Sequence, residues 1–185
     1  MKISILLPYK ENFSPIYPGA VSLFVNDTTK ISKYKKDITI FGNTNYKKRF
    51  NLNYENIFLK KSLFQSLSKQ YVFEFIKKEK VNKSSLIEIH NRPNYLKYLI
   101  SNLNKRTYAL YFHNDPLTMT GSKSIDDRIF LLKNCFKIIF NSNWSKKRFL
   151  EGMKNKFINS DKLIVCFQSA DKKIVNINKK NNWIT

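Results

Sequence analysis

Short apolar runs rich in β-branched residues alternate along this chain with longer segments in which apolar residues recur every three or four positions. The first pattern predicts buried strands, and the second predicts amphipathic helices. Strands are expected at 2–8, 37–42, 85–91, 106–114, 137–142 and 162–169. Strands that alternate with helices form parallel sheets through right-handed crossovers, with helices on both faces. The sequence therefore predicts an α/β, Rossmann-like domain with a mainly parallel sheet.

The clearest helical pattern covers 63–80, where one stripe holds Leu63, Phe64, Leu67, Tyr71, Val72, Phe75 and Ile76. Other helices are expected over 20–33, 92–105, 124–135 and 143–152. Pro93 suits the first turn of one of them, and Ser124 is expected to cap another, with acidic residues directly after it. Residues 43–61 show no clear period and predict a long loop.

Composition indicates a folded domain. A chain of 185 residues can bury a sizeable core, and its 15% aromatic content argues against disorder. Cys135 and Cys166 each lie among apolar neighbours, so both are expected to be buried thiols rather than a disulfide or a zinc site. The N-terminal apolar run is too short for a signal peptide, and no stretch is long and apolar enough to span a membrane. A cytoplasmic location is therefore expected.

The net charge of +21 favours an anionic partner, such as nucleic acid, an acidic membrane leaflet or a phosphorylated substrate. Lysines occur in nearly every segment, however, together with many Asn, Ile, Phe and Tyr residues. A general bias in residue usage would produce the same composition. Both explanations stay open at this point.

Polar side chains collect directly after the expected strands. His90, Asn91 and Arg92 follow the third strand, and His113 and Asp115 follow the fourth. These positions hold both histidines of the chain. Because ligands of parallel α/β sheets bind at the carboxyl ends of the strands, this constellation indicates a binding site.

Several of these residues also have structural explanations. Pro93 and Pro116 can set loop geometry, and Asn91 and Asn114 can cap helices or turns. Gly19 either permits a tight entry into the helix at 20–33 or lets a phosphate approach its N-terminus. The sequence lacks the three-glycine dinucleotide pattern, the P-loop, G-x-S-x-G and H-E-x-x-H. Hydrolases and NTP-hydrolysing enzymes are therefore disfavoured.

A resemblance rests on five stretches that cover nearly the whole chain in order: "LPYKENFSPIYPGAVSLFV", "LIEIHNRPNYLKYLI", "YFHNDP", "LLKNCFKIIFNSNWSKKRFLEG" and "KLIVCFQSAD". Together they resemble the N-terminal half of family 4 glycosyltransferases of the GT-B fold. The likeness is strongest to bacterial enzymes that build lipopolysaccharide or other surface glycans.

This resemblance implies two Rossmann-like domains with a cleft between them, the first mainly for the acceptor and the second mainly for a nucleotide-sugar donor. It implies retaining glycosyl transfer without a metal or other cofactor. By position, His113 matches the histidine that faces the reacting sugar, and Gly19 matches the glycine that approaches the donor diphosphate. The acceptor side of the cleft is expected to hold His90, Asn91, Arg92, Asn141 and Trp144.

The chain departs from the family pattern where Pro18 precedes Gly19, because a glycine pair is common there. The glycosyltransferase domain is expected over 1–175, with a linker or the start of a second domain at 176–185, so this half should be inactive alone. A lipid-linked acceptor at an anionic inner leaflet would give the positive charge a use, and peripheral membrane binding is then expected.

Two other functions stay open. A basic Rossmann-like module could bind nucleic acid or an anionic glycan, although no RNA-binding signature is visible and no specific nucleic acid is expected. A Rossmann-like subunit could also depend on a partner chain to complete its site.

Overall fold

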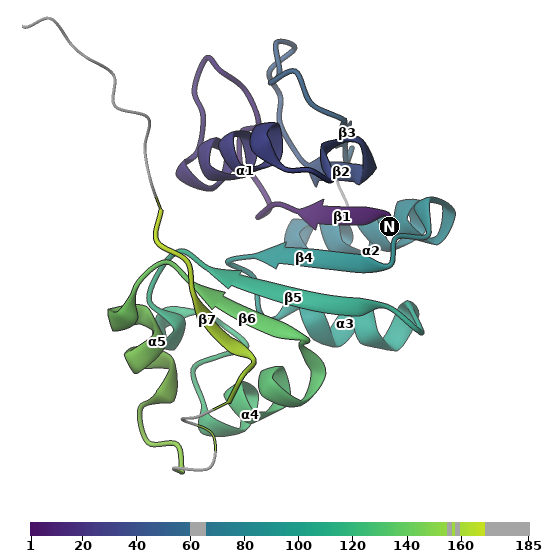
Figure 1. The fold of residues 1–185 in the computed structure, drawn as a ribbon. Coiled ribbons are helices and arrows are strands. Elements are labelled where there is room, and N and C mark those ends of the chain that lie inside the picture. Colours follow the sequence, from purple (N-terminus) through teal and green to yellow (C-terminus); the bar gives the residue numbers. More distant parts are fainter. Residues whose placement is uncertain (60–65, 155–156, 158–159, 169–185) are drawn as a thin grey trace, which may run out of the picture.

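A single parallel sheet organises the computed structural model, which describes residues 1–59, 66–154, 157 and 160–168. The strand order is β3-β2-β1-β4-β5-β6-β7, and every neighbouring pair is parallel (Figure 1). The strands are β1 (Ile3–Leu6), β2 (Ile38–Gly42), β3 (Tyr54–Asn56), β4 (Leu86–His90), β5 (Thr107–Phe112), β6 (Lys137–Phe140) and β7 (Leu163–Val165). Six of them lie where the apolar runs predicted strands.

The remaining strand, β3, corrects the expectation of a long loop over 43–61. Its three residues pair with β2, with Tyr54 opposite Ile40 and Asn56 opposite Gly42. A strand of three residues is too short to show an alternating pattern. Pairing with the free edge of β2, rather than local sequence, creates this strand.

Five helices connect the strands in the described part of the chain: α1 (Ala20–Ile31), α2 (Leu67–Asn82), α3 (Tyr95–Asn102), α4 (Ile125–Asn134) and α5 (Asn143–Leu150). Two short 3-10 helices, η1 (Lys35–Asp37) and η2 (Pro116–Thr118), accompany them. Ser124 caps α4 as expected, because its Oγ accepts from the Asp127 N–H at 3.0 Å. The α2 stripe is buried at Tyr71, Val72, Phe75 and Ile76, while the expected first residues of this helix, 63–65, lie outside the described residues.

The two faces of the sheet carry separate cores. Val21 and Val25 of α1 pack with Ile5 on one face. The larger cluster on the other face combines α2 to α5 with alternate strand residues such as Ile87 and Ile89. Consequently α1 and α3 lie on different sides of the sheet (Figure 1), as expected for right-handed crossovers in both directions from the centre.

The cysteines differ from each other. Cys135 is buried as expected, and burial raises the pKa of its thiol to about 12. The expectation for Cys166 was wrong, because this residue is exposed. It follows β7, an edge strand with a neighbour on one side only. An apolar run in the sequence does not reveal whether the strand will lie at the edge of the sheet.

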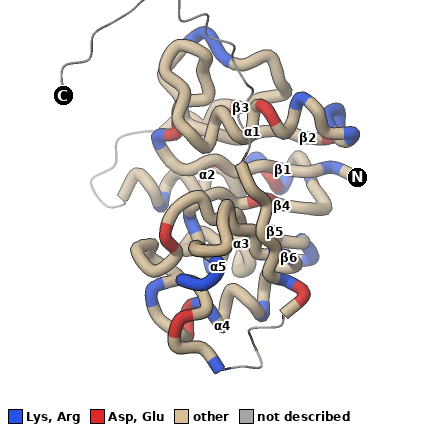
Figure 2. The backbone as a smooth tube through the Cα atoms, turned by 60° about the vertical axis from the view of Figure 1, so that its left-hand side comes forward, with Lys and Arg blue, Asp and Glu red and all other residues tan. Residues whose placement is uncertain are grey.

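Lysine and arginine are distributed over much of the backbone, including the ends of several helices and strands (Figure 2). No helix within the described residues has the length and apolar character that a membrane crossing requires.

A buried carboxylate connects α2 to the sheet. Glu79 has no exposed surface and accepts hydrogen bonds from the Ser84 N–H at 2.7 Å and from the hydroxyls of Ser84 and Ser4. Arg106 Nε lies 3.6 Å from the same carboxylate. Because these partners belong to β1 and to the segments before β4 and β5, one side chain holds four parts of the fold together.

We expect Glu79→Ala to lower the free energy of unfolding by about 3 kcal/mol, because it leaves several buried donors and a nearby guanidinium without their acceptor. Urea denaturation measures the change. Glu74→Ala on the same helix is the control, since Glu74 forms only a partly exposed pair with Lys77 and its loss should change stability by less than about 0.5 kcal/mol. Equal effects of the two variants would contradict the role of Glu79.

Candidate functional site

The candidate site lies where the strand order reverses, between β1 and β4. Connections leave these two strands in opposite directions, which opens a crevice at their carboxyl ends. A cavity of about 260 Å³ occupies this position. Its lining combines segments that follow β1, β4, β5 and β7: Pro8, Glu11, Ala20, Val21, Asn91, Arg92, His113, Asn114 and Gln168. Three residues expected at the cleft, Asn91, Arg92 and His113, therefore meet around one cavity.

Asn91 sets the geometry of this edge. Its φ of 51° lies in the left-handed region, which asparagine tolerates better than most residues. Its N–H donates to the Tyr111 carbonyl at 2.9 Å, and its side-chain Oδ1 accepts from the His113 N–H at 2.8 Å. The side chain is buried and fixes the residue after β5 against the end of β4. Asn91 therefore has a structural role, although its side chain joins the ends of two strands and does not cap a helix or a turn.

A chain of hydrogen bonds runs along β4 and β5 into the cavity. Glu88 Oε1 lies 2.6 Å from His90 Nε2, and His90 Nδ1 lies 2.8 Å from His113 Nε2. The other nitrogen of His113, Nδ1, contacts the Gln168 side-chain amide. Glu88 and His90 share one face of β4 because side chains two residues apart point the same way.

The proton positions follow from the groups at the two ends of the chain. An ionised Glu88 only accepts, so His90 Nε2 carries a proton and His90 Nδ1 is free to accept from His113 Nε2–H. His113 Nδ1 then accepts from the Gln168 amide nitrogen. If the Gln168 oxygen faced His113 instead, His113 Nδ1 would carry the proton and His113 Nε2 would accept from His90 Nδ1. His90 would then be protonated on both nitrogens. In the neutral arrangement His113 Nδ1 is an acceptor whose partner is Gln168, and both residues line the cavity.

Burial favours the neutral form of His113. The pKa of this residue is lowered to about 3, first by burial and then by the neighbouring His90. The folded-state pKa is therefore below the unfolded value of about 6.5. The stability linked to neutral His113 is complete above that unfolded value and is lost as the pH falls toward 3. At neutral pH this residue accepts a hydrogen bond and carries no positive charge.

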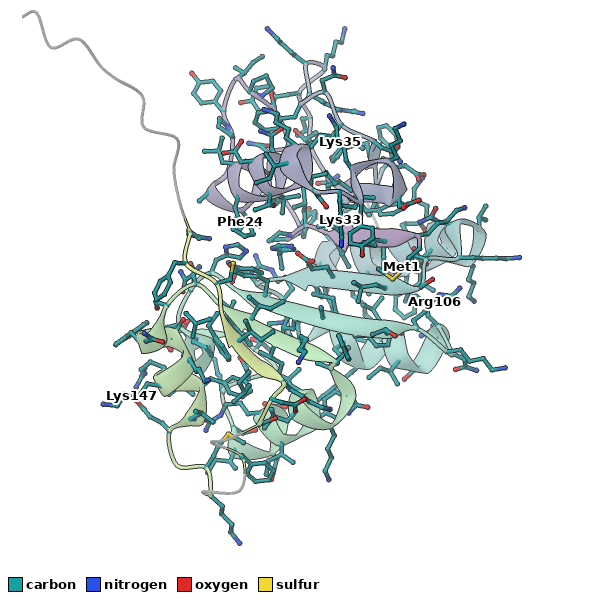
Figure 3. The ribbon with its side chains drawn as sticks, viewed as in Figure 1. Met1, Phe24, Lys33, Lys35, Arg106 and Lys147 are labelled. Carbon is teal, nitrogen blue, oxygen red and sulfur yellow. The ribbon has the colours of Figure 1, made fainter. Side chains whose placement is uncertain are left out.

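Aromatic rings enclose the histidines. Tyr111 stacks on His113 with 4.4 Å between ring centroids and on His90 with 5.4 Å. Phe24 points from α1 toward this edge of the sheet (Figure 3), and its ring lies 5.1 Å from that of His113. The Tyr111 hydroxyl donates to the Cys166 carbonyl at 2.9 Å. These contacts limit rotation of the His113 ring.

The end of α1 near Gly19 holds a carboxylate of the chain itself. Glu11 Oε1 accepts from the Ser22 N–H at 2.9 Å. A Cβ atom at Gly19 would lie 1.8 Å from Glu11 Oε1, so the absence of a side chain at this position makes room for Glu11. A donor phosphate at this helix end would meet a like charge. The geometry therefore favours the structural explanation of Gly19, and its phosphate role stays a prediction.

The other expected residues occupy different places. Asn141 supports the site, because its Nδ2 donates to the His113 carbonyl at 2.7 Å. Arg92 lines the cavity and donates from Nη1 to the Asn91 carbonyl at 2.8 Å. His90 has no exposed surface and reaches the cavity only through His113. Trp144 is 58% exposed, lies beside the Arg148 guanidinium and does not line the cavity.

Sequence reasoning missed Glu11 and Glu88 as parts of this site. Glu88 had a signal, since it and His90 alternate with isoleucines within an otherwise apolar strand. Glu11 had none, because it lies in a loop whose path depends on tertiary contacts. Among the described residues, no group of three or more His, Cys, Asp or Glu side chains could hold a metal ion.

Comparison with known proteins shows which solved structures share this fold. No protein-family model and no curated protein matches the chain. The match to solved structures confirms the predicted fold, an α/β domain with a parallel sheet flanked by helices that corresponds to about half of a GT-B fold. The similar structures are those of Anabaena Alr3699/HepE in complex with UDP and glucose (18% identity, TM-score 0.61), with UDP (16%, 0.60) and with UDP-glucose (14%, 0.60). Each alignment covers 92% of this chain and 45% of that chain, so this chain spans less than half the length of the proteins it matches.

We expect His113 to remain a neutral Nε2–H tautomer from about pH 8 to about pH 5, a range that includes the usual histidine pKa of about 6.5. Long-range ¹H–¹⁵N spectra of protein labelled in its 2 histidines measure this directly. Glu88→Gln should perturb the tautomers of both rings, because an amide can also donate to His90. Glu74→Gln, at a partly exposed position of α2, should change neither spectrum. A His113 ring that titrates near its usual pKa would contradict the assignment.

Proposed function

We propose that this chain is the N-terminal half of a retaining glycosyltransferase that moves a sugar from a nucleotide-sugar donor to a glycan or lipid-linked acceptor. The fold supports this proposal, because it corresponds to part of chains that were crystallised with UDP, glucose and UDP-glucose. The observation that carries it is neutral His113, which lines a cavity at the switch point of the sheet and whose acceptor nitrogen contacts the exposed Gln168.

The chemistry of this cavity suits sugar hydroxyls better than phosphates. His113 Nδ1 and the Glu11 carboxylate both accept hydrogen bonds, and hydroxyls can donate to them. A fully ionised phosphate could pair with Arg92, but it has no proton to donate to His113 Nδ1 or Glu11 and would be repelled by the Glu11 carboxylate. Gln168, which contacts His113 Nδ1, is exposed and could be displaced by a hydroxyl. We therefore assign the diphosphate of the donor mainly to the other half of the enzyme.

His113 then acts by position and polarity. In the transfer, the bond between the anomeric carbon and the diphosphate breaks, a bond from that carbon to an acceptor hydroxyl oxygen forms with retention of configuration, and the departing diphosphate takes the hydroxyl proton. Positive charge develops on the sugar ring in such a reaction. A neutral histidine that is hydrogen-bonded through His90 to the Glu88 carboxylate can hold a sugar hydroxyl and stabilise that charge. It does not attack the anomeric carbon.

The remaining parts of the proposal concern the rest of the enzyme. The half described by the structure would bind mainly acceptor and be inactive alone, and Asn91, Arg92, Asn141 and Trp144 stay candidates on the acceptor side. The expected linker at 176–185 lies outside the described residues. We place the enzyme in the cytoplasm, at the inner face of the membrane when its acceptor is lipid-linked, in the synthesis of bacterial surface glycans such as lipopolysaccharide.

We expect His113→Ala to lower kcat at least about 100-fold in the natural full-length polypeptide, because it removes a preorganised polar contact to the reacting sugar. The measurement is transfer from a panel of nucleotide sugars, including deoxy-sugar donors. The substitution should have little further effect on the donor that lacks the hydroxyl bound by His113. Val81→Ala, on the exposed surface of α2, is the control.

Full activity of His113→Ala with every donor would overturn the role of this residue. If the polypeptide instead transfers no sugar and binds an oligonucleotide or an anionic glycan with salt dependence, the binding-module alternative holds.

A further inference from the structure

A second and larger cavity, of about 760 Å³, lies at the carboxyl ends of β1, β2 and β3. The segment that follows β1 separates it from the histidine cavity, since Glu11 lines the first cavity while Lys10 and Asn12 line the second. Both cavities thus open along the same edge of the sheet, where loops converge. Its walls come mainly from the loop after β2, in residues 43–49.

The charges that line this cavity are all positive. This uniform sign, rather than the number of cations, indicates what the cavity can bind. Among the described residues, its lining includes Lys10, Lys47 and Arg49 and no Asp or Glu. Because 34 of 185 residues are Lys or Arg, composition alone predicts a similar number of cations at any site of this size. The first cavity, in contrast, has one carboxylate, Glu11, and one guanidinium, Arg92. The two cavities therefore differ in net charge: the second is positive, and the first is balanced.

Arg49 lines this cavity and packs against an aromatic ring. Its guanidinium lies 5.1 Å from the centre of the Tyr54 ring. Its Nε–H is buried and has no hydrogen-bond acceptor within the described part of the chain. Because this nitrogen is enclosed by the protein, a ligand in the cavity does not reach it, and Arg49 is an anion contact through its charge and its place in the cavity lining. Arginine also matches the planar geometry of carboxylate and phosphate groups.

The polar wall beside Arg49 is fixed before any ligand binds. Asn56 Oδ1 accepts from the Thr44 N–H at 3.0 Å and from the Tyr54 hydroxyl at 2.9 Å. Asn43 Nδ2 donates to the Ile57 carbonyl at 2.8 Å. These bonds connect the loop after β2 to β3 and its end. The loop that carries Lys47 and Arg49 is thereby anchored at its start.

Aromatic rings at this cavity suit a sugar. Phe58 is 76% exposed although it lines the cavity, and Tyr9 and Tyr46 line it as well. Exposed aromatic faces at a concave site provide apolar contact for the C–H face of a sugar ring while its hydroxyls bind amides. Lys10 adopts a left-handed φ of 68°, a costly conformation for lysine that is often retained at functional loops.

We propose that this second cavity binds the acceptor through an anionic group, a phosphate or a carboxylate attached to a sugar, with Arg49, Lys47 and Lys10 as its counter-charges. The term acceptor rests on the proposed function, whereas binding of an anionic saccharide does not. Two sources fit the same chemistry, an acidic or phosphorylated glycan and a lipid-linked sugar phosphate.

Binding to the chain itself tests this proposal. Titration calorimetry with glucose 6-phosphate, glucuronate and glucose covers the soluble source, and sedimentation with phosphatidylglycerol or phosphatidylcholine vesicles covers the lipid source. We expect an anionic probe to bind and its neutral counterpart to bind at least about tenfold more weakly, as loss of one charge-assisted contact predicts. Binding of the soluble anions would identify a glycan, and binding of phosphatidylglycerol vesicles alone would identify a lipid headgroup.

Matched variants distinguish anion binding in the cavity from attraction by the overall positive charge of the protein. Arg49→Gln and Lys47→Gln should each weaken anion binding about tenfold. Lys36→Gln removes the same charge at an exposed position in η1, away from the cavity lining, and should leave binding unchanged. Lys47 is exposed, so its variant tests the cavity even if Arg49→Gln lowers stability through the lost contact with Tyr54.

Equal loss of binding in Lys36→Gln, equal binding of glucose and its phosphate, or displacement of the anionic saccharides by an oligonucleotide with nucleotide preference would overturn the proposal. Its failure can be told from failure of the proposed function. If a full-length polypeptide transfers no sugar but binds anions in a way that depends on Lys47, the anion site is supported and the proposed glycosyltransferase function is rejected.

Discussion

The reversal of strand order between β1 and β4 is the constraint on which the rest of the site depends. Neighbouring parallel strands require crossovers, and right-handed crossovers that start in opposite directions place their helices on opposite faces. The segments after β1 and β4 therefore separate and leave a crevice between them. Glu11 enters it from one side, and Asn91 and Arg92 enter from the other. This topology positions polar groups that are eighty residues or more apart in sequence.

Within that crevice, hydrogen bonding determines what the histidines can do. A histidine after a strand could serve as an acid, a base, a metal ligand or an anion contact. The contacts from Glu88 through His90 to His113 restrict the second histidine to a neutral form with its acceptor nitrogen outward. The burial that lowers its pKa acts in the same direction. Both effects favour a hydroxyl-bearing ligand at this point.

One loop separates two cavities of different character. The segment after β1 gives a carboxylate to the histidine cavity and a lysine to the larger cavity beside it. If both proposals hold, a neutral part of one sugar and an anionic group of another would lie on either side of this loop. Such an arrangement would orient two substrates on either side of one loop.

The sequence by itself determined the class of fold and six of the strands, because apolar periodicity reports which side chains must be buried. It also placed His113, Asn91 and Arg92 at the carboxyl edge, since that edge follows from strand order along the chain. Only the tertiary structure decided that β3 pairs with β2, that Cys166 is exposed at an edge strand, and that Glu11 occupies the end of α1. These features depend on which segments become neighbours in space, and short-range patterns carry no information about such contacts.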